Sequence, residues 1–226
     1  MRKIDLNVDV AEGFPFDEKL AWWATSANVA CGGHAGSWEI AKSAIAVFRE
    51  RGARIGVHPG YPDRDTMGRV SPTPDRAADW LADVAAQVQA FVARFPRVAA
   101  YIKPHGAFYH DSTRASTPAF ETLAAIVVRH RLPLMGLSGT AHEQAARYGF
   151  IREGFADRGY TPDGRLIPRG QPGAMLDDPR AIRSQVLCLA RTVDSICVHG
   201  DKPNSVEHAS LVYETLLYAG YDVGWR

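Results

Sequence analysis

The sequence predicts an α/β protein whose parallel strands close into a TIM-like (β/α) barrel of about seven strands. Short apolar runs alternate with longer segments of helical period about seven times, with no long linker between them. Polar residues follow nearly every apolar run, whereas an open doubly wound sheet gathers them at one switch point. Residues 1–226 are expected to form one domain, because this length suits a single large core.

Each expected strand is a short run rich in apolar residues. The strands are expected at residues 4–10, 27–31, 54–57, 98–102, 132–137, 150–153 and 195–198. The final residues, YDVGWR, are expected either to form a short extra strand or to lie across the mouth of the barrel.

Capping residues indicate where the intervening helices begin. Ser37, Thr117 and Asp178 each precede an amphipathic segment, and Pro follows the last two of them at the first helical position. A long helix is expected to begin at Thr73, and the last helix at Asn204. Apolar residues at helical spacing give each segment one face that can cover the strands.

Composition and charge limit the partners that are expected. The formal net charge is +1, from 26 basic and 25 acidic residues, so neither nucleic acid nor an anionic membrane is an expected partner. No apolar stretch approaches a membrane span, and MRKIDLNVDV lacks the apolar region of a signal peptide, which favours a cytoplasmic protein. Three cysteines without a CxxC spacing predict neither a disulfide framework nor a structural zinc site.

The first expected strand alternates between polar and apolar residues. Successive residues of a strand point to opposite faces, so Asp5, Asn7 and Asp9 are expected to point into the barrel. The same alternation groups polar residues on three later strands: Tyr101 with Lys103 and His105, Glu153 with Asp157, and Cys197 with His199 and Asp201. In a barrel these strand ends converge on the C-terminal mouth, where such folds hold their sites.

Four apolar runs end in a histidine beside glycine or Pro-Gly, and this recurrence is the main sign of a shared site. Carboxylates and histidines can act as general bases, and lysine and arginine can hold a carboxylate or a phosphate. The catalytic candidates are Asp9, Glu12, His34, His58, Lys103, His105, Asp157 and His199. The substrate-binding candidates are Asn7, Cys31, Arg158 and Asp201. The other histidines, His110, His130, His142 and His208, are expected on the surface or in helices.

Aspartate together with several histidines also suits metal binding, and the sequence leaves the choice between acid–base and metal roles open. No HxxxH or HExxH pair occurs, so a metal site would be assembled from separate strands, and its ligands stay unassigned. The sequence also lacks a G-x-x-x-x-G-K-[ST] loop, a G-x-G-x-x-G and a G-x-S-x-G. Neither a P-loop nucleotide site nor a serine hydrolase elbow is therefore expected.

Six ordered motifs carry a resemblance to a known family: DLNVDVAE, TSANVACGGHAG, GVHPGYPD, YIKPHGAFY, EGFADRGY and ICVHGD. They run from residue 5 to about residue 203, and the chain resembles the LamB/YcsF family, the family of the A subunit of 5-oxoprolinase. The resemblance implies a seven-stranded barrel related in shape to polysaccharide deacetylases. It also implies ATP-dependent hydrolysis of the lactam 5-oxoproline, or of a related small lactam, to L-glutamate, in a complex with subunits B and C. The cofactors that follow from it are ATP and a divalent metal, for which Mg²⁺ is the candidate.

The chain departs from the usual motifs of the family at a few positions. Where the family usually reads DLNCDLGE, Val8 replaces the cysteine and Ala11 the glycine. Where it usually reads ACGFHAGD, Gly33 replaces the phenylalanine and Ser37 the acid. The acids and histidines of the motifs remain, so these departures bear on the substrate more than on the reaction class.

Our hypothesis for the chemistry is that phosphorylation activates the lactam oxygen and that water then attacks the ring carbon. Asp9 paired with one of the four histidines would activate this water, while Lys103 and Arg158 would hold the phosphoryl group or the substrate carboxylate. Two alternatives are kept. One is a metal-dependent amide hydrolase or deacetylase on a similar barrel, and the other is a non-catalytic subunit that binds the substrate.

Overall fold

The computed structural model describes residues 1–225, and within them seven parallel strands close into a barrel. The barrel strands follow the order of the chain and are β1 (Lys3–Val10), β2 (Ser26–Ala30), β3 (Arg54–His58), β4 (Ala99–Ile102), β5 (Leu134–Leu137), β6 (Phe150–Phe155) and β7 (Ser195–Val198). Strand β1 pairs with both β2 and β7, and this double pairing closes the ring. The predicted (β/α) barrel is thus confirmed.

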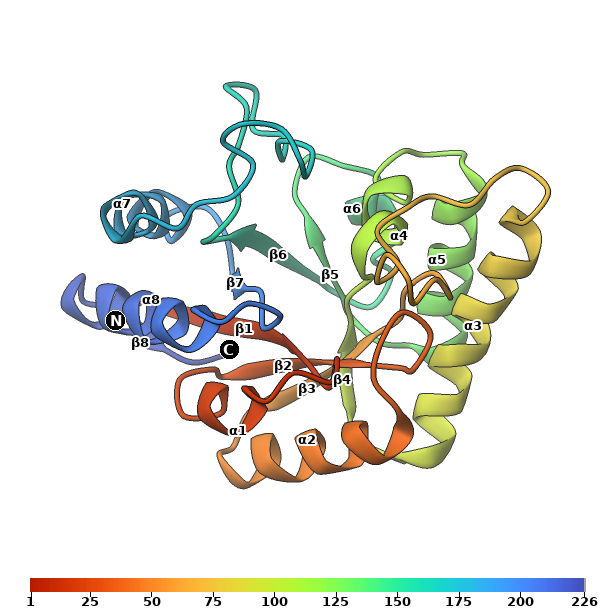
Figure 1. Cartoon of the computed structure of the whole chain (residues 1–226), viewed down its shortest axis with the longest axis horizontal. Coiled ribbons are helices and arrows are strands. Elements are labelled where there is room, and N and C mark those ends of the chain that lie inside the picture. The colour runs from red at the N-terminus through yellow and green to blue at the C-terminus, as the bar shows by residue number, and fades with distance from the viewer. Residues whose placement is uncertain (226) are drawn as a thin grey trace.

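Helices surround the strands, as Figure 1 shows. They are α1 (Asp17–Leu20), α2 (Trp38–Glu50), α3 (Ala77–Arg94), α4 (Gly106–Asp111), α5 (Pro118–His130), α6 (His142–Ala145), α7 (Pro179–Leu189) and α8 (Ser205–Tyr218). The connections after β1 and β5 contain only the short helices α1 and α6. In the described part of the chain, no helix has both the length and the apolar character needed to cross a bilayer.

Three of the predicted helix starts are confirmed by their capping hydrogen bonds. The side-chain oxygens of Ser37, Thr117 and Asp178 each accept a bond from the backbone N–H three residues later, at 3.3, 3.2 and 3.0 Å. Helix α3 begins later than the expected Thr73. The N–H of Arg76 bonds to the carbonyl of Thr73 at 2.9 Å, and this forms a separate turn ahead of the helix.

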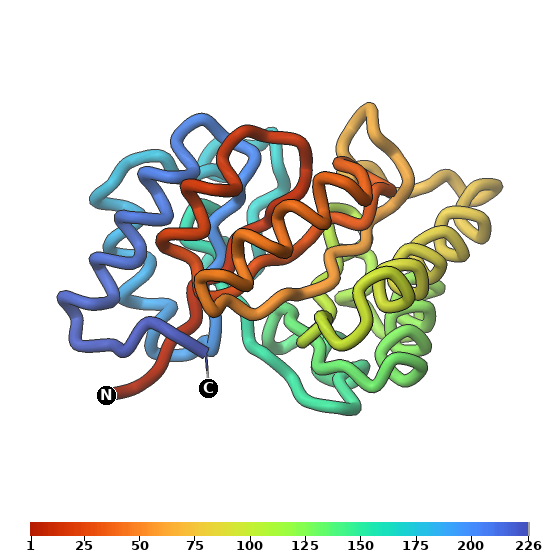
Figure 2. The backbone as a smooth tube through the Cα atoms, turned by 90° about the horizontal axis from the view of Figure 1, so that it is seen from below, coloured from red at the N-terminus to blue at the C-terminus, as the bar shows by residue number. Residues whose placement is uncertain are grey.

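The C-terminal segment forms the short extra strand β8 (Asp222–Val223). It pairs in parallel with Lys3 and Ile4 at the amino end of β1. Strand β8 therefore lies at the end of the barrel opposite to the mouth, and of the two expected positions for YDVGWR the extra strand is the correct one. The two ends of the described chain lie close together, as Figure 2 shows.

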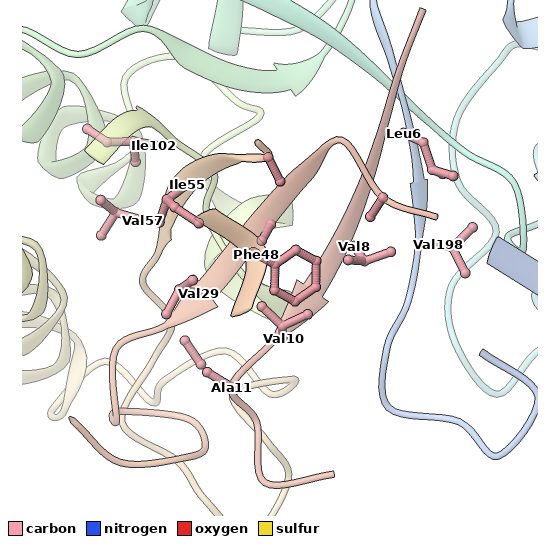
Figure 3. Close-up of a cluster of buried hydrophobic side chains, with 14 of the residues drawn as sticks. Leu6, Val8, Val10, Ala11, Val29, Phe48, Ile55, Val57, Ile102 and Val198 are labelled. Carbon is pink, nitrogen blue, oxygen red and sulfur yellow. The ribbon is translucent and has the colours of Figure 1, made fainter. Parts of the chain in front are cut away.

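The apolar core lies between the strands and the helices. Leu6, Val8 and Val10 of β1 are buried in one cluster with Phe48 of α2, and Figure 3 shows these side chains on the same side of the sheet. Burial of a large apolar side chain contributes roughly 1.5–3 kcal/mol, so this outer layer is the main source of stability. The alternate residues of β1 point into the barrel.

The interior of the barrel is polar, whereas barrels of this class are usually filled by branched apolar side chains. Ser195 donates a hydrogen bond from its hydroxyl to Asp5, and it accepts one from Asn7 Nδ2 at 2.8 Å. Asn28 then donates to Asn7 Oδ1 at 2.7 Å and to Asp9 Oδ1 at 2.8 Å. These bonds satisfy the buried polar groups and form a continuous ladder that ends at Asp9, at the mouth.

Candidate active site

A cavity opens at the carboxyl ends of the strands. Its walls come from the ends of β1, β3, β4, β6 and β7 and from the loops that follow β3 and β6. The charged and aromatic side chains that line it are Asp9, His58, Arg69, Lys103, His105, Tyr109, His110, Phe155, Arg158, Arg169 and His199. The predicted convergence of strand ends therefore brings half of the candidate residues to the wall of this cavity: Asp9, His58, Lys103, His105, Arg158 and His199.

Lys103 places a buried ammonium group at the cavity. Its Nζ lies 2.7 Å from Asp9 Oδ1, 2.8 Å from Glu153 Oε1 and 3.1 Å from Asn7 Oδ1. Burial alone would lower the pKa of Lys103, but the neighbouring acidic groups, Asp9 first, hold it well above its usual value. These contacts occupy the donors of Lys103, which favours a role in balancing two carboxylates over direct contact with a substrate anion.

The carboxylate of Asp9 is fixed by several donors. Lys103 and Asn28 both donate to its Oδ1, and Nε2 of His58 lies 3.6 Å from the same oxygen. Burial acts to raise the pKa of Asp9, but Lys103 and then His58 oppose it and hold the pKa well below its usual range. A carboxylate with so low a pKa is a weak base, so this geometry favours an electrostatic role for Asp9.

Three histidines and one glutamate form a compact cluster beside the cavity. Glu12, His34, His58 and His105 each offer one ligand atom, and these atoms all lie within 4.8 Å of one another. The Oε1 of Glu12 lies 3.3 Å from His34 Nε2 and 3.5 Å from His105 Nδ1. Burial lowers the pKa of His58 to about 3 and that of His105 well below its usual value, so both rings are neutral near pH 7. This cluster can hold a metal ion, and its four residues lie at or just after the ends of four separate strands.

A second pair, His199 and Asp157, lies across the cavity at the ends of β7 and β6. The Nδ1 of His199 lies 2.8 Å from Asp157 Oδ1, and its ring stacks on Phe155 with 5.5 Å between ring centroids. Burial acts to raise the pKa of Asp157, but His199 lowers it to about 2, so the carboxylate is ionised and accepts from the Nδ1–H. Because Nδ1 is engaged, Nε2 is the nitrogen left for a ligand in the cavity. This is the arrangement of a general base oriented by a carboxylate.

Three arginines border the same cavity. Arg158 is only 2% exposed, and its Nε and Nη2 donate to two backbone carbonyls at 3.1 and 2.7 Å. Burial, together with the charge of Arg169, lowers the pKa of Arg158 to about 10. Arg69 forms an ion pair with Asp201. Three guanidinium groups at one cavity suit an anionic ligand such as a carboxylate or a phosphate.

Two glycines of the histidine motifs are required by close approach. A Cβ on Gly200 would lie 2.1 Å from the carbonyl oxygen of Asp9, so the loop after His199 can meet β1 only with glycine at this position. A Cβ on Gly60 would lie 2.7 Å from Nδ1 of His34. The recurring glycine beside histidine in the sequence thus reflects tight packing around the site.

Three of the predicted substrate-binding residues do not line the cavity. Asn7 lies deeper inside the barrel than Asp9, and Asn28 donates a hydrogen bond to each of them. Cys31 belongs to the apolar core, and burial raises the pKa of its thiol to about 12, which excludes a reactive thiolate near neutral pH. Asp201 reaches the cavity only through its ion pair with Arg69. Arg158 is the member of this set that lines the cavity.

Several residues of the site were not among the candidates from the sequence. Arg69 and Arg169 lie in the long loops after β3 and β6, and no periodic pattern marks them. Glu153 shares the strand face of Asp157, and this alternation is the signal that could have identified it.

His142, expected on the surface or in a helix, begins α6 and is fully buried. Its Nε2 lies 3.0 Å from the hydroxyl of Ser112, which points to a structural role.

Comparison with known proteins identifies the family. A model of the LamB/YcsF family matches residues 4–224. The chain belongs to the LamB/YcsF family. A member from Neisseria meningitidis serogroup C (strain 053442), named as the A subunit of 5-oxoprolinase, is 40% identical over 99% of this chain and 99% of its own length.

Solved structures extend this likeness to three dimensions. The crystal structure of a lactam utilization protein from Thermus thermophilus is 30% identical, with a TM-score of 0.81 over 99% of this chain and 100% of its own. A structure described as T48 deacetylase with substrate is 13% identical, with a TM-score of 0.52 over 98% of this chain and 87% of its own. The second likeness shows a shared fold only, and it agrees with the expected relation to deacetylase-type barrels.

One departure from the usual LamB/YcsF motif leaves a strained backbone. Ala11 stands where the family usually has glycine, and its φ is +62°, in the left-handed region that disfavours residues with a Cβ. Its N–H donates to Asp17 Oδ2 at 3.0 Å and so fixes the turn. Glu12 follows directly, so this turn directs Glu12 toward the histidines.

At the second departure, a neighbouring side chain occupies the space beside the glycine. Gly33 stands where the family usually has phenylalanine, and a Cβ there would lie 2.1 Å from Nε2 of Gln87. Gln87 of α3 occupies this space and binds the backbone of Gly60, accepting from its N–H at 3.1 Å and donating to its carbonyl at 2.8 Å. Gln87 thereby supports the loop against which His34 packs.

Proposed function

We propose that this chain is the component of an ATP-dependent lactam hydrolase that opens 5-oxoproline to L-glutamate together with two partners, subunits B and C. The observation that carries this proposal is the His199–Asp157 pair, which faces a cavity bordered by three arginines. A general base opposite an anion-binding rim suits hydrolysis of a small anionic amide. The names of the relatives, which describe the A subunit of 5-oxoprolinase and a lactam utilization protein, support the same substrate class.

The proposed reaction uses ATP because the five-membered lactam is a stable amide. Transfer of the γ-phosphoryl group to the lactam oxygen releases ADP and makes the ring carbon electrophilic. Water then adds to this carbon, and the bond between carbon and ring nitrogen breaks to give the amine and an acyl phosphate. A second water cleaves the acyl phosphate to carboxylate and phosphate. The net change is consumption of one ATP and two waters per glutamate formed.

The residues at the cavity have distinct parts in this scheme. His199 takes a proton from the attacking water at Nε2 and returns it to the leaving ring nitrogen, while Asp157 holds the ring in place and stabilises its positive charge. Arg158, Arg169 and Arg69 attract the substrate carboxylate or the phosphoryl oxygens. Lys103 keeps Asp9 and Glu153 ordered beneath them. This proposal assigns the role of general base to His199. The sequence had left the choice among four histidines open.

Nucleotide binding is assigned to the complex. The sequence contains no P-loop motif. We propose that one of the partners holds most of the ATP, with the Mg²⁺ that usually accompanies its phosphates, and that the arginines of this chain meet the transferred phosphoryl group.

The histidine cluster favours a second candidate function, a metal-dependent amide hydrolase that needs no ATP. Glu12, His34, His58 and His105 lie beside the same cavity, and a deacetylase shares the fold. The two candidates differ in one observable. The lactam hydrolase requires ATP and its partners, whereas a metal-dependent amide hydrolase would act alone and without ATP.

Glutamate release from 5-oxoproline tests the proposal directly. The chain is assayed alone and with its B and C partners, with and without ATP, and ADP is measured in parallel. We expect glutamate and ADP in equal amounts, and only when all three proteins and ATP are present. Glutamate formed by the chain alone without ATP would favour the metal-dependent hydrolase, and no glutamate from the folded complex would refute the proposed substrate.

A further inference from the structure

His58 and His105 face each other through nitrogens that carry no proton. Nδ1 of His58 lies 2.8 Å from the carbonyl oxygen of Lys103, and Nε2 of His105 lies 2.8 Å from that of Met67. A carbonyl oxygen can only accept, so each of these nitrogens carries the proton of its neutral ring. The two opposite nitrogens therefore hold lone pairs, and they lie 2.9 Å apart. Two lone pairs at this distance repel each other unless a cation lies against both.

Two further donors surround the same point. Oε1 of Glu12 lies 3.5 Å from Nδ1 of His105 and 3.3 Å from Nε2 of His34. Four ligands placed about 2.0–2.1 Å from a tetrahedral Zn²⁺ lie about 3.3 Å from one another. The three measured separations of 2.9, 3.3 and 3.5 Å cluster around that value. All four donor atoms lie within 4.8 Å of one another, and their side chains are buried. The rings of His34 and His105 are stacked, with 3.8 Å between their centroids, so one of the two rings has to turn before both can bind one ion. His34 is the ring that is free to turn, because its Nδ1 has no hydrogen-bond partner among the described residues.

We propose that these four residues form a site for one divalent transition-metal ion of the Zn²⁺ class: Glu12, His34, His58 and His105. Three imidazole nitrogens and one carboxylate oxygen suit Zn²⁺ or Co²⁺, whereas Mg²⁺ prefers oxygen ligands. The carbonyls of Lys103 and Met67 act as the outer hydrogen-bond partners that orient metal-binding histidines. Asp9, 3.6 Å from Nε2 of His58, adds a second negative charge beside the ion.

The site lies at the wall of the cavity. His58 and His105 line the cavity, while Glu12 and His34 complete the cluster behind them. A bound ion of this class supplies Lewis-acid polarisation of a carbonyl or phosphoryl oxygen. The inference goes beyond the proposed lactam hydrolase and does not depend on it, because it rests on donor geometry and is tested by binding.

Metal binding by the purified full-length chain tests the inference without an activity assay. Elemental analysis measures the metal that the chain carries after purification. The chain is then stripped with a chelator, and Zn²⁺, Co²⁺ and Mg²⁺ are each titrated by calorimetry. We expect one equivalent of Zn²⁺ or Co²⁺ with a rise in thermal unfolding temperature, visible absorption from tetrahedral Co²⁺, and much weaker binding of Mg²⁺.

Substitutions locate the ion within the chain. His58→Gln and Glu12→Gln should each lower the Zn²⁺ affinity at least about tenfold, whereas His130→Gln on the outer helix α5 should leave it unchanged. If His58→Gln does not fold, Glu12→Gln decides. The inference is overturned if no equivalent of Zn²⁺ or Co²⁺ binds, if Mg²⁺ binds equally well, or if Glu12→Gln binds Zn²⁺ as tightly as His130→Gln does.

Discussion

Nδ1 of His199 lies 2.8 Å from Oδ1 of Asp157, and this buried pair joins the end of β7 to the loop after β6. Burial acts to raise the pKa of Asp157, but His199 lowers it to about 2 from an ordinary value of 3.8. A folded-state pKa below the unfolded value means that the carboxylate stabilises the fold above about pH 4. This stabilisation, about 2 kcal/mol, is lost as the pH falls toward 2.

Replacing Asp157 should therefore make the free energy of unfolding less dependent on pH in acid. In Asp157→Asn, we expect the free energy of unfolding to decline less steeply between about pH 4 and pH 2 than in the wild type. Urea unfolding at a series of pH values measures this slope, with Asp65→Asn in an exposed loop as the matched control. Equal slopes in Asp157→Asn and the wild type would contradict the assignment.

Lys103 should be essential to the stability of the polar interior. Lys103→Met keeps the approximate volume but leaves Asp9 and Glu153 without their cation, which should cost about 3–5 kcal/mol in unfolding free energy. Adding Glu153→Gln should recover part of this loss, because one buried carboxylate is removed. Lys42→Met at an exposed position of α2 should change stability by less than about 0.5 kcal/mol. The ion-pair account is wrong if urea unfolding gives Lys103→Met and Lys42→Met the same stability.

Arg169 should select substrates that carry a carboxylate. It lines the cavity and is exposed, so its contribution is screened by water, and Arg169→Gln should weaken 5-oxoproline binding up to about fivefold. The neutral ring 2-pyrrolidinone, which lacks the carboxylate, should bind both proteins equally. Calorimetric titration of the assembled complex with each lactam measures the difference. A matching loss for both lactams would show that Arg169 acts on the shape of the site and not on the carboxylate.

Glycine, which the family usually has at the position of Ala11, should stabilise the turn there. At a φ of +62°, Ala11→Gly removes the clash of a Cβ in the left-handed region and should stabilise the fold by about 0.5–1 kcal/mol. The same change at exposed Ala86 within α3 should destabilise it by about 1 kcal/mol. Urea unfolding of the two variants should give effects of opposite sign. If both variants lose stability, the turn at Ala11 is not strained.

The sequence was sufficient to predict the barrel and the place of the site. The alternation in IDLNVDV predicted which residues of β1 face the helices and which face the interior, and both sets are where it placed them. Four apolar runs end in a histidine beside glycine or Pro-Gly, at residues 34, 58, 105 and 199. These histidines predicted a shared site because the carboxyl ends of parallel strands meet at one mouth. This reasoning needs only local periodicity and the general geometry of a parallel barrel.

The division of that site into two groups could not be predicted. Whether His58 meets Glu12 or Asp157 depends on the order and tilt of strands around the barrel, which no local pattern contains. The ion pair between Lys103, which directly follows β4, and Glu153 of β6 could not be predicted for the same reason. It crosses the interior of the barrel, and neither segment carries a local pattern that indicates the other. Arg169 belongs to a loop whose path is set by tertiary contacts rather than by periodicity.

Turnover by a complex that contains His199→Gln tests the central claim most directly. The variant chain is assembled with its B and C partners, assembly is checked by size-exclusion chromatography, and glutamate release from 5-oxoproline with ATP is compared with the wild type. If His199 is the general base, kcat should fall at least about 100-fold while the complex still forms. Turnover close to that of the wild type, in a complex of the same size, would contradict the assignment and would favour a chain that binds the lactam without taking part in its hydrolysis.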